Sequence, residues 1–250
     1  MSENEFKLYD TLEKDHWWFK ARRNILAVFL NIIEKTGEKT ILEIGCGTGG
    51  NLIYLFQDFK KRIGLEINET AIKYARRKKI GNTNIIKGNA NNLDMTLKPV
   101  DCVALLDVLY HENIESVDSS LIQVNKLLKK DGYLLISDGA FDILQGSHSD
   151  TVNSVRRFTK KGLIEKLSNA NFKIVRASYW GFSLFFLLFF KRFIIERFFQ
   201  KNSSKQSTDL VSIPIIDDLL YLSLELEKLV LKSFNLPFGA SVFILAQKIK

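Results

Sequence analysis

Apolar and polar residues follow two different periods along the chain, and the switches between them predict alternating strands and helices. Short apolar runs predict seven strands, at residues 40–44, 62–66, 84–87, 101–106, 133–137, 172–178 and 241–249. Apolar residues at helical spacing predict helices at 16–35, 51–59, 69–79, 115–130 and 159–169. Because neighbouring parallel strands need a long crossover, this alternation predicts an α/β fold with a doubly wound sheet.

A long segment, residues 179–239, separates the last two predicted strands. At about sixty residues it is too long for an ordinary connection, so it must contain structure of its own. It opens with a Phe-rich apolar stretch and a basic flank at Lys191, Arg192 and Arg197, and a second amphipathic pattern covers 215–234. We therefore predict a helical insertion, suited to form a lid over an apolar acceptor. The last strand follows this excursion and closes the chain, so we expect it to run antiparallel to the others.

The pattern divides the chain into three parts. An N-terminal helical cap covers 1–37, the sheet domain covers 38–178 together with 240–250, and the helical insertion covers 179–239. With 250 residues the chain can bury a sizeable core, and we expect one globular unit.

The composition is that of a folded domain, because 46% of the residues are hydrophobic and 26% are charged. The formal net charge of +8 attracts phosphate-bearing partners, and nucleic acid and an anionic membrane surface both fit it. Cys46 and Cys102 fall in strand or turn positions, so we expect no disulfide framework and a reducing cytoplasm. The histidines, at 16, 111 and 148, show no metal-ligand spacing with these cysteines, and we predict no metal site.

Two stretches bear on the cellular location. Residues 1–15 lack the apolar run of a signal peptide, so export is not expected. Residues 177–190 are uncharged, but these 14 residues fall short of the ~20 that a membrane-spanning helix needs. The segment 179–199 fits an interfacial anchor, and it also fits a buried helix or a homodimer interface. We predict a cytoplasmic protein, with peripheral contact at the inner face of the membrane left open.

A glycine-rich turn follows the first predicted strand, where residues 43–50 read EIGCGTGG. Glycines let the backbone turn sharply and approach a ligand, and the next helix offers free N–H groups at its N-terminus. The turn also satisfies the dinucleotide pattern G-x-G-x-x-G, and Glu66 stands 21 residues beyond Gly45, where a ribose-binding acid is expected. The turn alone therefore does not choose between cofactors.

Other positions favour a cofactor that carries an amino acid. Glu43 places a carboxylate at the pocket floor, where it can receive an ammonium group or its water but would repel a pyrophosphate. Asn89 follows the third strand and Asp107 follows the fourth, so polar side chains line the carboxyl edge of the sheet. The sequence thus favours S-adenosylmethionine, bound across the carboxyl ends of the first, second and fourth strands.

Several motifs carry a resemblance to a known family. Residues 41–49 (ILEIGCGTG) resemble the first-strand motif of class I S-adenosylmethionine-dependent methyltransferases, and the resemblance covers nearly the whole chain. Residues 16–23 (HWWFKARR), 156–159 (RRFT) and 236–241 (LPFGAS) resemble a subgroup of bacterial and archaeal methyltransferases often associated with glycan and lipid pathways. The family implies a Rossmann-like fold of seven strands, the last antiparallel, which agrees with the predicted count.

The resemblance implies roles for individual residues. Glu66 should hold the ribose hydroxyls, Asn89 should face the adenine amino group, and Asp107 with Val108 should line the methionine side. The family more often has Asp at the position of Asn89, and an amide can still hydrogen-bond the adenine edge. The full set of expected cofactor residues is Trp18, Arg22, Glu43, Gly45, Cys46, Gly47, Gly49, Asn51, Glu66, Ile67, Asn89, Ala90, Asp107 and Val108.

Three of the expected site residues have two interpretations. His111 fits a general base that takes the proton from an attacking hydroxyl, and it also fits a structural histidine that caps the loop after the fourth strand. Because methyl transfer often needs only alignment of nucleophile and sulfonium, a base is not required. Trp18 and its aromatic neighbours fit a cover over the cofactor, in which Arg22 or Arg23 pairs the carboxylate of its methionine part. They also fit a second interpretation, in which the aromatic rings pack in the core and the arginines form a solvated basic face.

Three functions remain open. The first is O- or C-methylation of a small or lipid-linked acceptor, such as a polyprenyl-linked sugar or a quinone, which the Phe-rich insertion favours. The second is methylation of RNA or protein, which the charge favours, but residues 107–110 (DVLY) lack an Asn-Pro-Pro-Tyr-like base-flipping tetrad, so nucleic acid is disfavoured. The third is a non-catalytic protein that binds the cofactor or serves as a membrane scaffold.

Overall fold

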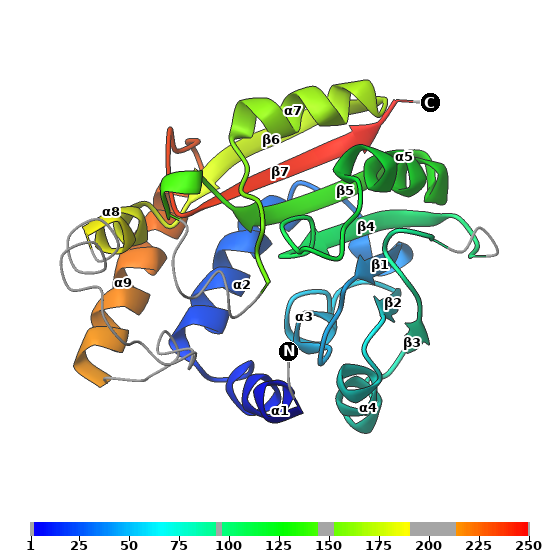
Figure 1. Ribbon diagram of the computed structural model, residues 1–250, viewed down its shortest axis with the longest axis horizontal. Coiled ribbons are helices and arrows are strands. Elements are labelled where there is room, and N and C mark those ends of the chain that lie inside the picture. The colour runs from blue at the N-terminus through cyan, green and yellow to red at the C-terminus, as the bar shows by residue number, and fades with distance from the viewer. Residues whose placement is uncertain (1–2, 94–96, 145–152, 191–213, 250) are drawn as a thin grey trace.

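The computed structural model describes residues 3–93, 97–144, 153–190 and 214–249. Helices cover both faces of one seven-stranded sheet, which confirms the predicted Rossmann-like architecture (Figure 1). The strands are β1 (Thr40–Ile44), β2 (Lys61–Glu66), β3 (Thr83–Lys87), β4 (Val100–Leu106), β5 (Leu128–Gly139), β6 (Phe172–Trp180) and β7 (Ser241–Lys248). They lie side by side in the order β3-β2-β1-β4-β5-β7-β6.

The strand directions create the binding edge of the sheet. β1 to β5 run parallel, and β7 runs antiparallel between β5 and β6, as predicted for the last strand. The chain moves outward from β1 to β3 and then returns to place β4 on the other side of β1. The carboxyl ends of β1 and β4 therefore flank a topological switch point, where ligands of open α/β sheets bind.

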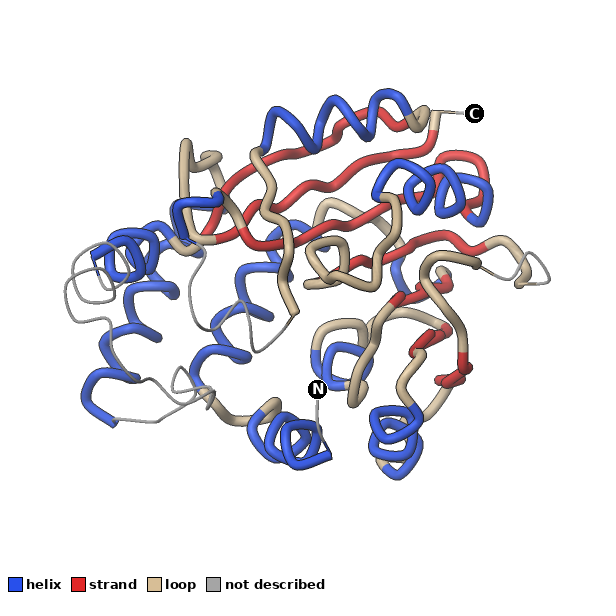
Figure 2. Tube along the Cα trace, viewed as in Figure 1, coloured by secondary structure: helices blue, strands red, loops and turns tan. Residues whose placement is uncertain are grey.

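The helices are α1 (Glu3–Leu12), α2 (Trp17–Leu30), α3 (Gly50–Tyr54), α4 (Glu69–Arg77), α5 (Val117–Leu127), α7 (Lys160–Asn169), α8 (Phe182–Phe190) and α9 (Pro214–Leu231). Two short 3₁₀ turns, η1 (Thr36–Glu38) and η2 (Asp142–Leu144), join them. In Figure 2 the tube shows α5 and α7 on one side of the sheet and α2 on the other. Successive strand residues face opposite layers, since Leu134 packs with α5 and α7 whereas Leu135 packs with α2 and α9.

The sequence of α2 explains its position against the sheet. His16 caps the helix, because its side chain accepts a hydrogen bond from the Trp18 N–H at 3.3 Å. Ile25 and Phe29, four residues apart, lie on the buried face. Phe29 stacks on Phe243 of β7 with ring centroids 3.9 Å apart. This contact fixes the outer helix to the only antiparallel strand among the described residues.

The described part of the insertion consists of α8 and α9, which are joined by hydrogen bonds. Glu227 of α9 accepts the N–H groups of Gly181 and Phe182 at 2.6 and 2.8 Å, so it satisfies free donors at the start of α8. α9 also packs along α2, which joins the insertion to the N-terminal segment. The proposed division into three parts remains a prediction, and the basic flank at 191–200 lies outside the described residues.

Several predicted boundaries differ from the structure. α2 ends at Leu30 instead of 35, and α5 ends at Leu127 because the chain enters β5 directly at Leu128. β6 extends through Trp180, so the first two residues of the expected insertion belong to the sheet. α1 was not predicted, because Phe6 is its only buried residue and its apolar pattern is weak. Among the described residues, no helix combines the length and hydropathy that crossing a membrane requires.

Candidate active site

A cavity of about 740 Å³ lies at the carboxyl edge of the sheet, between the glycine-rich turn, the N-terminal helices and α8. All the predicted site residues line it except Glu43 and Gly49. Those in its wall are Trp18, Arg22, Gly45, Cys46, Gly47, Asn51, Glu66, Ile67, Asn89, Ala90, Asp107, Val108 and His111. Gly49 instead caps the N-terminus of α3 with φ of 87°. The structure therefore brings predicted residues from five separate segments of the chain to one cavity.

Two glycines of the turn form the base of this cavity. Gly45 has φ of +71°, and a Cβ there would lie 2.8 Å from Cγ2 of Val108. Gly47 has φ of +53°, and a Cβ there would meet no atom within 4 Å. Both conformations favour glycine, and the space beside Gly47 is open to a ligand. The turn is thus a cradle shaped for close approach of a bound group.

Glu66, at the end of β2, is fixed by the backbone around it. Its Oε2 accepts the Gly47 N–H at 2.9 Å, and its Oε1 accepts the N–H groups of Ile67 and Asn68, each at 2.9 Å. A carboxylate oxygen has two lone pairs, so Oε1 is fully used by these two donors, whereas Oε2 can accept one further hydrogen bond from a ligand. This geometry fits a ribose hydroxyl that donates to Oε2.

Glu43 lies beneath the cavity and is not part of its wall. Asn51, which does line the cavity, donates from Nδ2 to Glu43 Oε1 at 2.6 Å. Oε2 is buried without a hydrogen-bond partner among the described residues. Burial raises the pKa of Glu43 to about 8, so the side chain carries a proton at neutral pH. The expected contact between Glu43 and an ammonium group would therefore have to pass through Asn51.

Arg22 and Asp107 form an ion pair across the cavity. Arg22 extends from α2 and places Nη2 2.7 Å from Oδ2 of Asp107, which follows β4. Asp107 adopts φ of 61°, a conformation that non-glycine residues rarely take and that is concentrated at functional sites. Its N–H donates to the Ser137 carbonyl at 2.8 Å. A cofactor carboxylate would have to share Arg22 with Asp107, whereas Arg23 donates to the carbonyls of residues 13 and 14.

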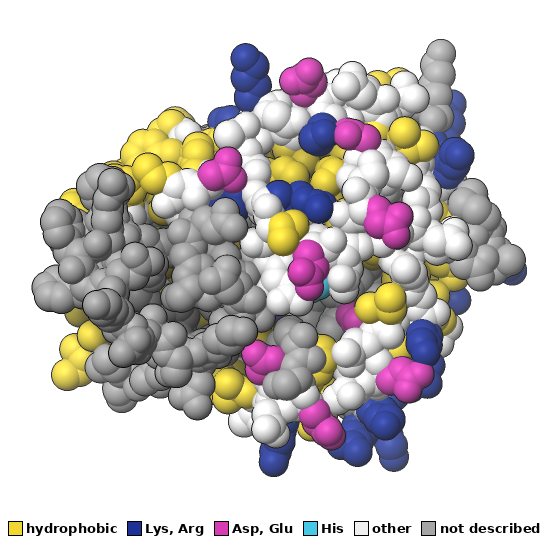
Figure 3. All heavy atoms as spheres, viewed as in Figure 1, with side chains coloured by type: hydrophobic (Ala, Val, Ile, Leu, Met, Phe, Trp, Pro, Cys, Tyr) yellow, Lys and Arg dark blue, Asp and Glu magenta, His cyan; other side chains and the backbone are white. Residues whose placement is uncertain are grey.

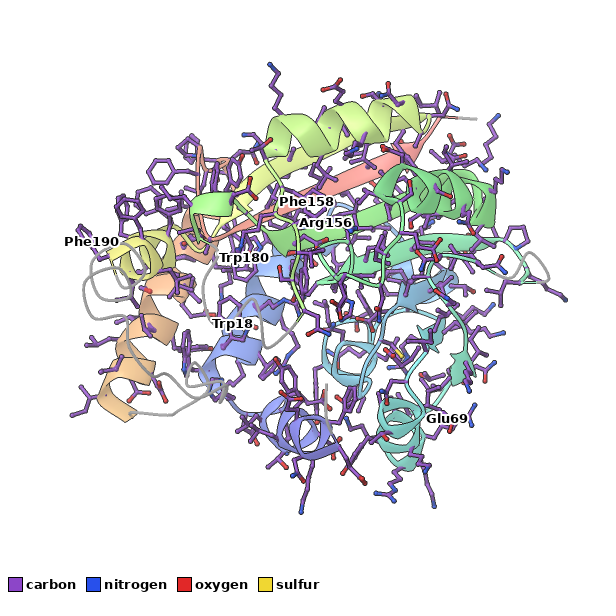
Figure 4. All side chains as sticks on the ribbon, in the orientation of Figure 1. Trp18, Glu69, Arg156, Phe158, Trp180 and Phe190 are labelled. Carbon is purple, nitrogen blue, oxygen red and sulfur yellow. The ribbon has the colours of Figure 1, made fainter. Side chains whose placement is uncertain are left out.

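The position of Trp18 is compatible with both of its predicted interpretations, and its contact with the cofactor stays a prediction. Its ring lines the cavity and also stacks on Trp180, with centroids 5.3 Å apart and an interplanar angle of 25°. Figure 4 shows the two labelled rings between α2 and the end of the sheet. The stack joins the start of α2 to the end of β6, so it positions the helix that carries Arg22 four residues later.

The unpredicted helix α1 is attached to the glycine-rich turn by buried polar contacts. Glu13, which follows α1, accepts the Thr48 hydroxyl at 2.6 Å and forms an ion pair with Lys78. Lys78 also lies 2.7 Å from Asp10 and donates to the Thr48 carbonyl at 2.6 Å. α1 is therefore a second cover of the cavity, to which it contributes Phe6 and Tyr9.

Burial raises the pKa of three more ionisable groups, of which Tyr9 and Tyr110 line the cavity and Asp138 lies beside it. Burial raises the pKa of Tyr9 to about 12 and raises the pKa of Tyr110 well above its usual range. Burial, reinforced by the charge of Asp107, also raises the pKa of Asp138 well above its usual range. Asp138 accepts the Tyr110 N–H at 3.2 Å through Oδ1. The charge of Asp107 contributes to all three of these raised pKa values, and the sequence pattern did not identify these groups.

His111 lies in the loop after β4 as predicted. Its Nδ1 accepts the Asn113 N–H at 3.1 Å, and burial lowers the pKa of the imidazole. The neutral ring in this arrangement carries its proton on Nε2, which makes Nε2 a donor. Arg156 braces the same loop through the Ile114 carbonyl at 2.8 Å (Figure 4). This geometry favours a hydrogen-bond donor over a general base.

The far end of the cavity is apolar. Leu184, Leu187 and Leu188 of α8 line it together with Leu220 of α9. Hydrophobic side chains also gather on the outer surface over α8 (Figure 3). Within the described part of the chain, no three His, Cys, Asp or Glu side chains come together as metal ligands would.

The strand order defines a Rossmann-like fold, with a glycine-rich cradle at the carboxyl edge of the sheet. Residues 42–136 match the family model described as "Methyltransferase domain", which covers β1 through most of β5. The matched segment contains the glycine-rich turn, Glu66, Asn89 and Asp107. This part of the chain is therefore similar to a methyltransferase domain, and the predicted cofactor, S-adenosylmethionine, fits its cradle.

Known proteins resemble the chain at low identity. An uncharacterised protein of Methanocaldococcus jannaschii is 24% identical over 257 residues, which cover 98% of this chain and 88% of that protein. A fatty-acid O-methyltransferase of Mycolicibacterium smegmatis is 33% identical over 103 residues, only 40% of this chain and 37% of that enzyme. The crystal structure of a SAM-dependent methyltransferase from Archaeoglobus fulgidus shares the fold, with a TM-score of 0.59 at 20% identity, covering 98% and 99% of the chains.

Proposed function

We propose that this protein transfers a methyl group from S-adenosylmethionine to an oxygen or carbon of a small or lipid-linked acceptor that carries an apolar chain. The observation that carries the proposal is the continuity of one cavity from the glycine-rich cradle to an apolar wall on α8 and α9. The polar end suits a nucleoside and an amino acid. The described residues of α8 and α9 that line the apolar end are all leucines, so this end suits a hydrocarbon segment.

The chain itself provides binding and alignment. When bound, S-adenosylmethionine supplies an electrophilic methyl group on a sulfonium. Glu66 is placed to accept a hydrogen bond from a ribose hydroxyl, and Asn89 to meet the adenine edge. His111 is suited to donate from Nε2 to an acceptor oxygen and so hold it in line. α1, α2 and α8 line the cavity around these polar contacts and limit its opening to solvent on their sides.

A relative supports the acceptor class without establishing it. The Mycolicibacterium smegmatis protein is named for a fatty-acid substrate, but the similarity covers 40% of this chain. That aligned length is less than the whole catalytic domain, so the acceptor is a proposal of this work. The +8 charge alone supports methylation of RNA or protein less directly, because no contact at the cavity requires a polyanion.

The test is methyl transfer from labelled cofactor to acceptors of equal headgroup and increasing chain length, with RNA and a protein mixture in parallel. We expect Leu187→Asn to raise KM for long-chain acceptors about 10- to 100-fold, because one leucine contact contributes about 1.5–3 kcal/mol. Its effect on short acceptors and on cofactor affinity should be small. The matched control is Ile122→Asn on α5, since Ile122 is 46% exposed and Leu187 is 50% exposed, but only Leu187 lines the cavity.

The alternatives give different results. Equal loss in both variants, or no dependence of KM on chain length, would rule out an apolar acceptor. Methylated RNA or protein in the parallel arms would identify the second function. Calorimetric binding of the cofactor without turnover on any acceptor would identify a non-catalytic binding protein.

A further inference from the structure

The two faces of α9 differ in what they contact. The inner face packs on α2 and buries Leu224 and Leu231 completely. The outer face exposes Ile215, Leu219, Leu222, Leu226 and Leu229, each to more than half of its surface, at 77%, 62%, 55%, 57% and 55%. α9 lies at the edge of the molecule, so this outer stripe has no described neighbour within the chain (Figure 1). An apolar stripe of this size marks an interaction surface.

The spacing of the stripe indicates what covers it. The five residues follow one another at steps of four, three, four and three. That is the seam of a heptad repeat, which is narrow and fits the side chains of one partner helix. A helix that lies in a membrane interface instead has a broad apolar face and a basic polar face. α9 carries four acidic residues, Asp217, Asp218, Glu225 and Glu227, against one lysine, so an anionic membrane is a poor partner.

We infer that α9 pairs with α9 of a second copy of this chain, in antiparallel orientation about a two-fold axis. A two-fold interface must be self-complementary, so residues at equal distances on either side of its centre meet each other. Leu222 and Leu226 lie symmetrically about position 224, and so do Leu219 and Leu229. Each leucine of the seam would therefore meet a leucine of the partner.

The charges beside the seam also fit only the antiparallel arrangement. Asp218 and Lys232 are both exposed and lie one residue before the seam positions Leu219 and 233, on one side of the seam. Residues on this side meet their partner copies about position 225, one residue from the centre of the seam at 224. Asp218 and Lys232 are symmetric about 225, so they would form two equivalent ion pairs across the axis. In a parallel pair the residue opposite Asp218 would be Ser223 of the partner helix, which offers no charge. On the other side of the seam, Ile216 and Val230 are symmetric about position 223 and extend the apolar contact.

The residue nearest the axis does not oppose this pairing. Glu225 would lie close to its own copy, and two free carboxylates there would repel. Its Oε1 accepts a hydrogen bond from Asn24 of α2 at 2.6 Å, and its Oε2 forms an ion pair with Lys228. The carboxylate is thereby turned toward its own chain and partly neutralised, which leaves the seam apolar.

The pairing would also reach the cavity. Leu220 lines the cavity and lies between two seam residues on the same helix, and Glu227 holds the start of α8. A dimer that fixes α9 would therefore fix the apolar wall of both sites. The inference concerns the assembly and holds whatever the acceptor is.

The test is sedimentation equilibrium of the full chain over a range of concentrations, and we expect a dimer that dissociates in the micromolar range. Asp218→Lys and Lys232→Asp should each weaken the dimer about tenfold or more, because each places like charges opposite one another. The double variant Asp218→Lys/Lys232→Asp should restore it. A parallel or unrelated interface would not show this rescue, and an absence of rescue overturns the antiparallel pairing.

Cysteine cross-linking provides a second test that does not depend on affinity. The native Cys46 and Cys102 are buried, so introduced thiols on α9 are selectively oxidised. A mixture of Leu222→Cys and Leu226→Cys chains should form a disulfide, whereas either variant alone should form little. Circular dichroism controls for folding. A monomer at all concentrations overturns the inference, and so does flotation of the monomer with anionic vesicles that is lost in Leu222→Asn, which would show that a membrane covers the seam.

Discussion

Glu43 is the buried carboxyl whose protonation should be visible in the stability of the protein. Burial raises the pKa of Glu43 from its ordinary 4.5 to about 8, so the folded chain keeps a proton that the unfolded chain has released. The stabilisation from this proton is complete below pH 4.5 and is lost as the pH rises through 8. Because one pKa unit corresponds to about 1.36 kcal/mol, the full effect is about 5 kcal/mol, and about 2.5 kcal/mol of it is lost between pH 5 and pH 7.

Glu43→Gln removes this titration while its amide oxygen can still accept the bond from Asn51 Nδ2. The free energy of unfolding is measured by urea titration at pH 5, 6, 7 and 8 without cofactor. We subtract the free energy of unfolding of the native chain from that of the variant. From pH 5 to pH 7 this difference should rise by about 2.5 kcal/mol, because only the native chain loses stability through Glu43. The other titrating groups cancel in this difference.

The matched control for this experiment is Glu34→Gln, because Glu34 is exposed after α2. Its stability should follow that of the native chain at every pH. A Glu43→Gln curve parallel to the native curve would refute the reasoning, since it would mean that Glu43 is ionised in the folded protein. In that case Asn51 alone could not explain how the charge is tolerated.

Three further predictions concern the cavity. Glu66→Gln should weaken cofactor binding about 10- to 100-fold by calorimetry, whereas exposed Glu69→Gln should not change it. Lys78→Met leaves Glu13 buried without its cation and should lower the free energy of unfolding by about 3 kcal/mol in urea. His111→Gln retains an N–H donor and should keep kcat within about tenfold, whereas His111→Ala should lose more. His111 would instead be a general base if both variants lost kcat equally and if the kcat of the native enzyme decreased as the pH is lowered below 6.5.

The sequence predicted the central strands of the sheet well because β1, β4 and β7 are buried on both faces. β4 reads VDCVALL, and all its residues except Asp101 are buried. A short apolar run of this kind is typical of a strand that is covered on both faces, so the sequence predicted it as a strand. The ligand edge followed from the same pattern, since polar residues mark where the buried runs stop. Helix ends were less well predicted because α5 passes directly into β5, and no glycine or proline separates them.

The covers of the cavity could not be predicted in the same way. α1 depends on Glu13, Thr48 and Lys78, which are 35 and 30 residues apart along the chain and carry no common motif. Asp138 lies near the end of a strand like many polar residues, and it is its burial beside Asp107 that raises its pKa. Burial of single polar groups is a tertiary property, and the period of a sequence does not encode it.

The residues that the sequence pattern predicts mainly form the cofactor cradle, whereas the residues that it does not predict mainly form the covers and the apolar wall of the acceptor site. The cradle is local, because Gly45, Gly47 and Glu66 belong to one strand-turn-helix-strand unit, which lies inside the segment that matches the methyltransferase-domain model. The apolar wall is assembled from α8 and α9, which reach the cavity only because Glu227 joins the two helices and α9 packs on α2. A substitution that alters the packing of α9 should therefore change acceptor choice while cofactor affinity stays constant. If the seam on α9 also holds a second copy, the same helix links the assembly of the protein to the shape of its acceptor site.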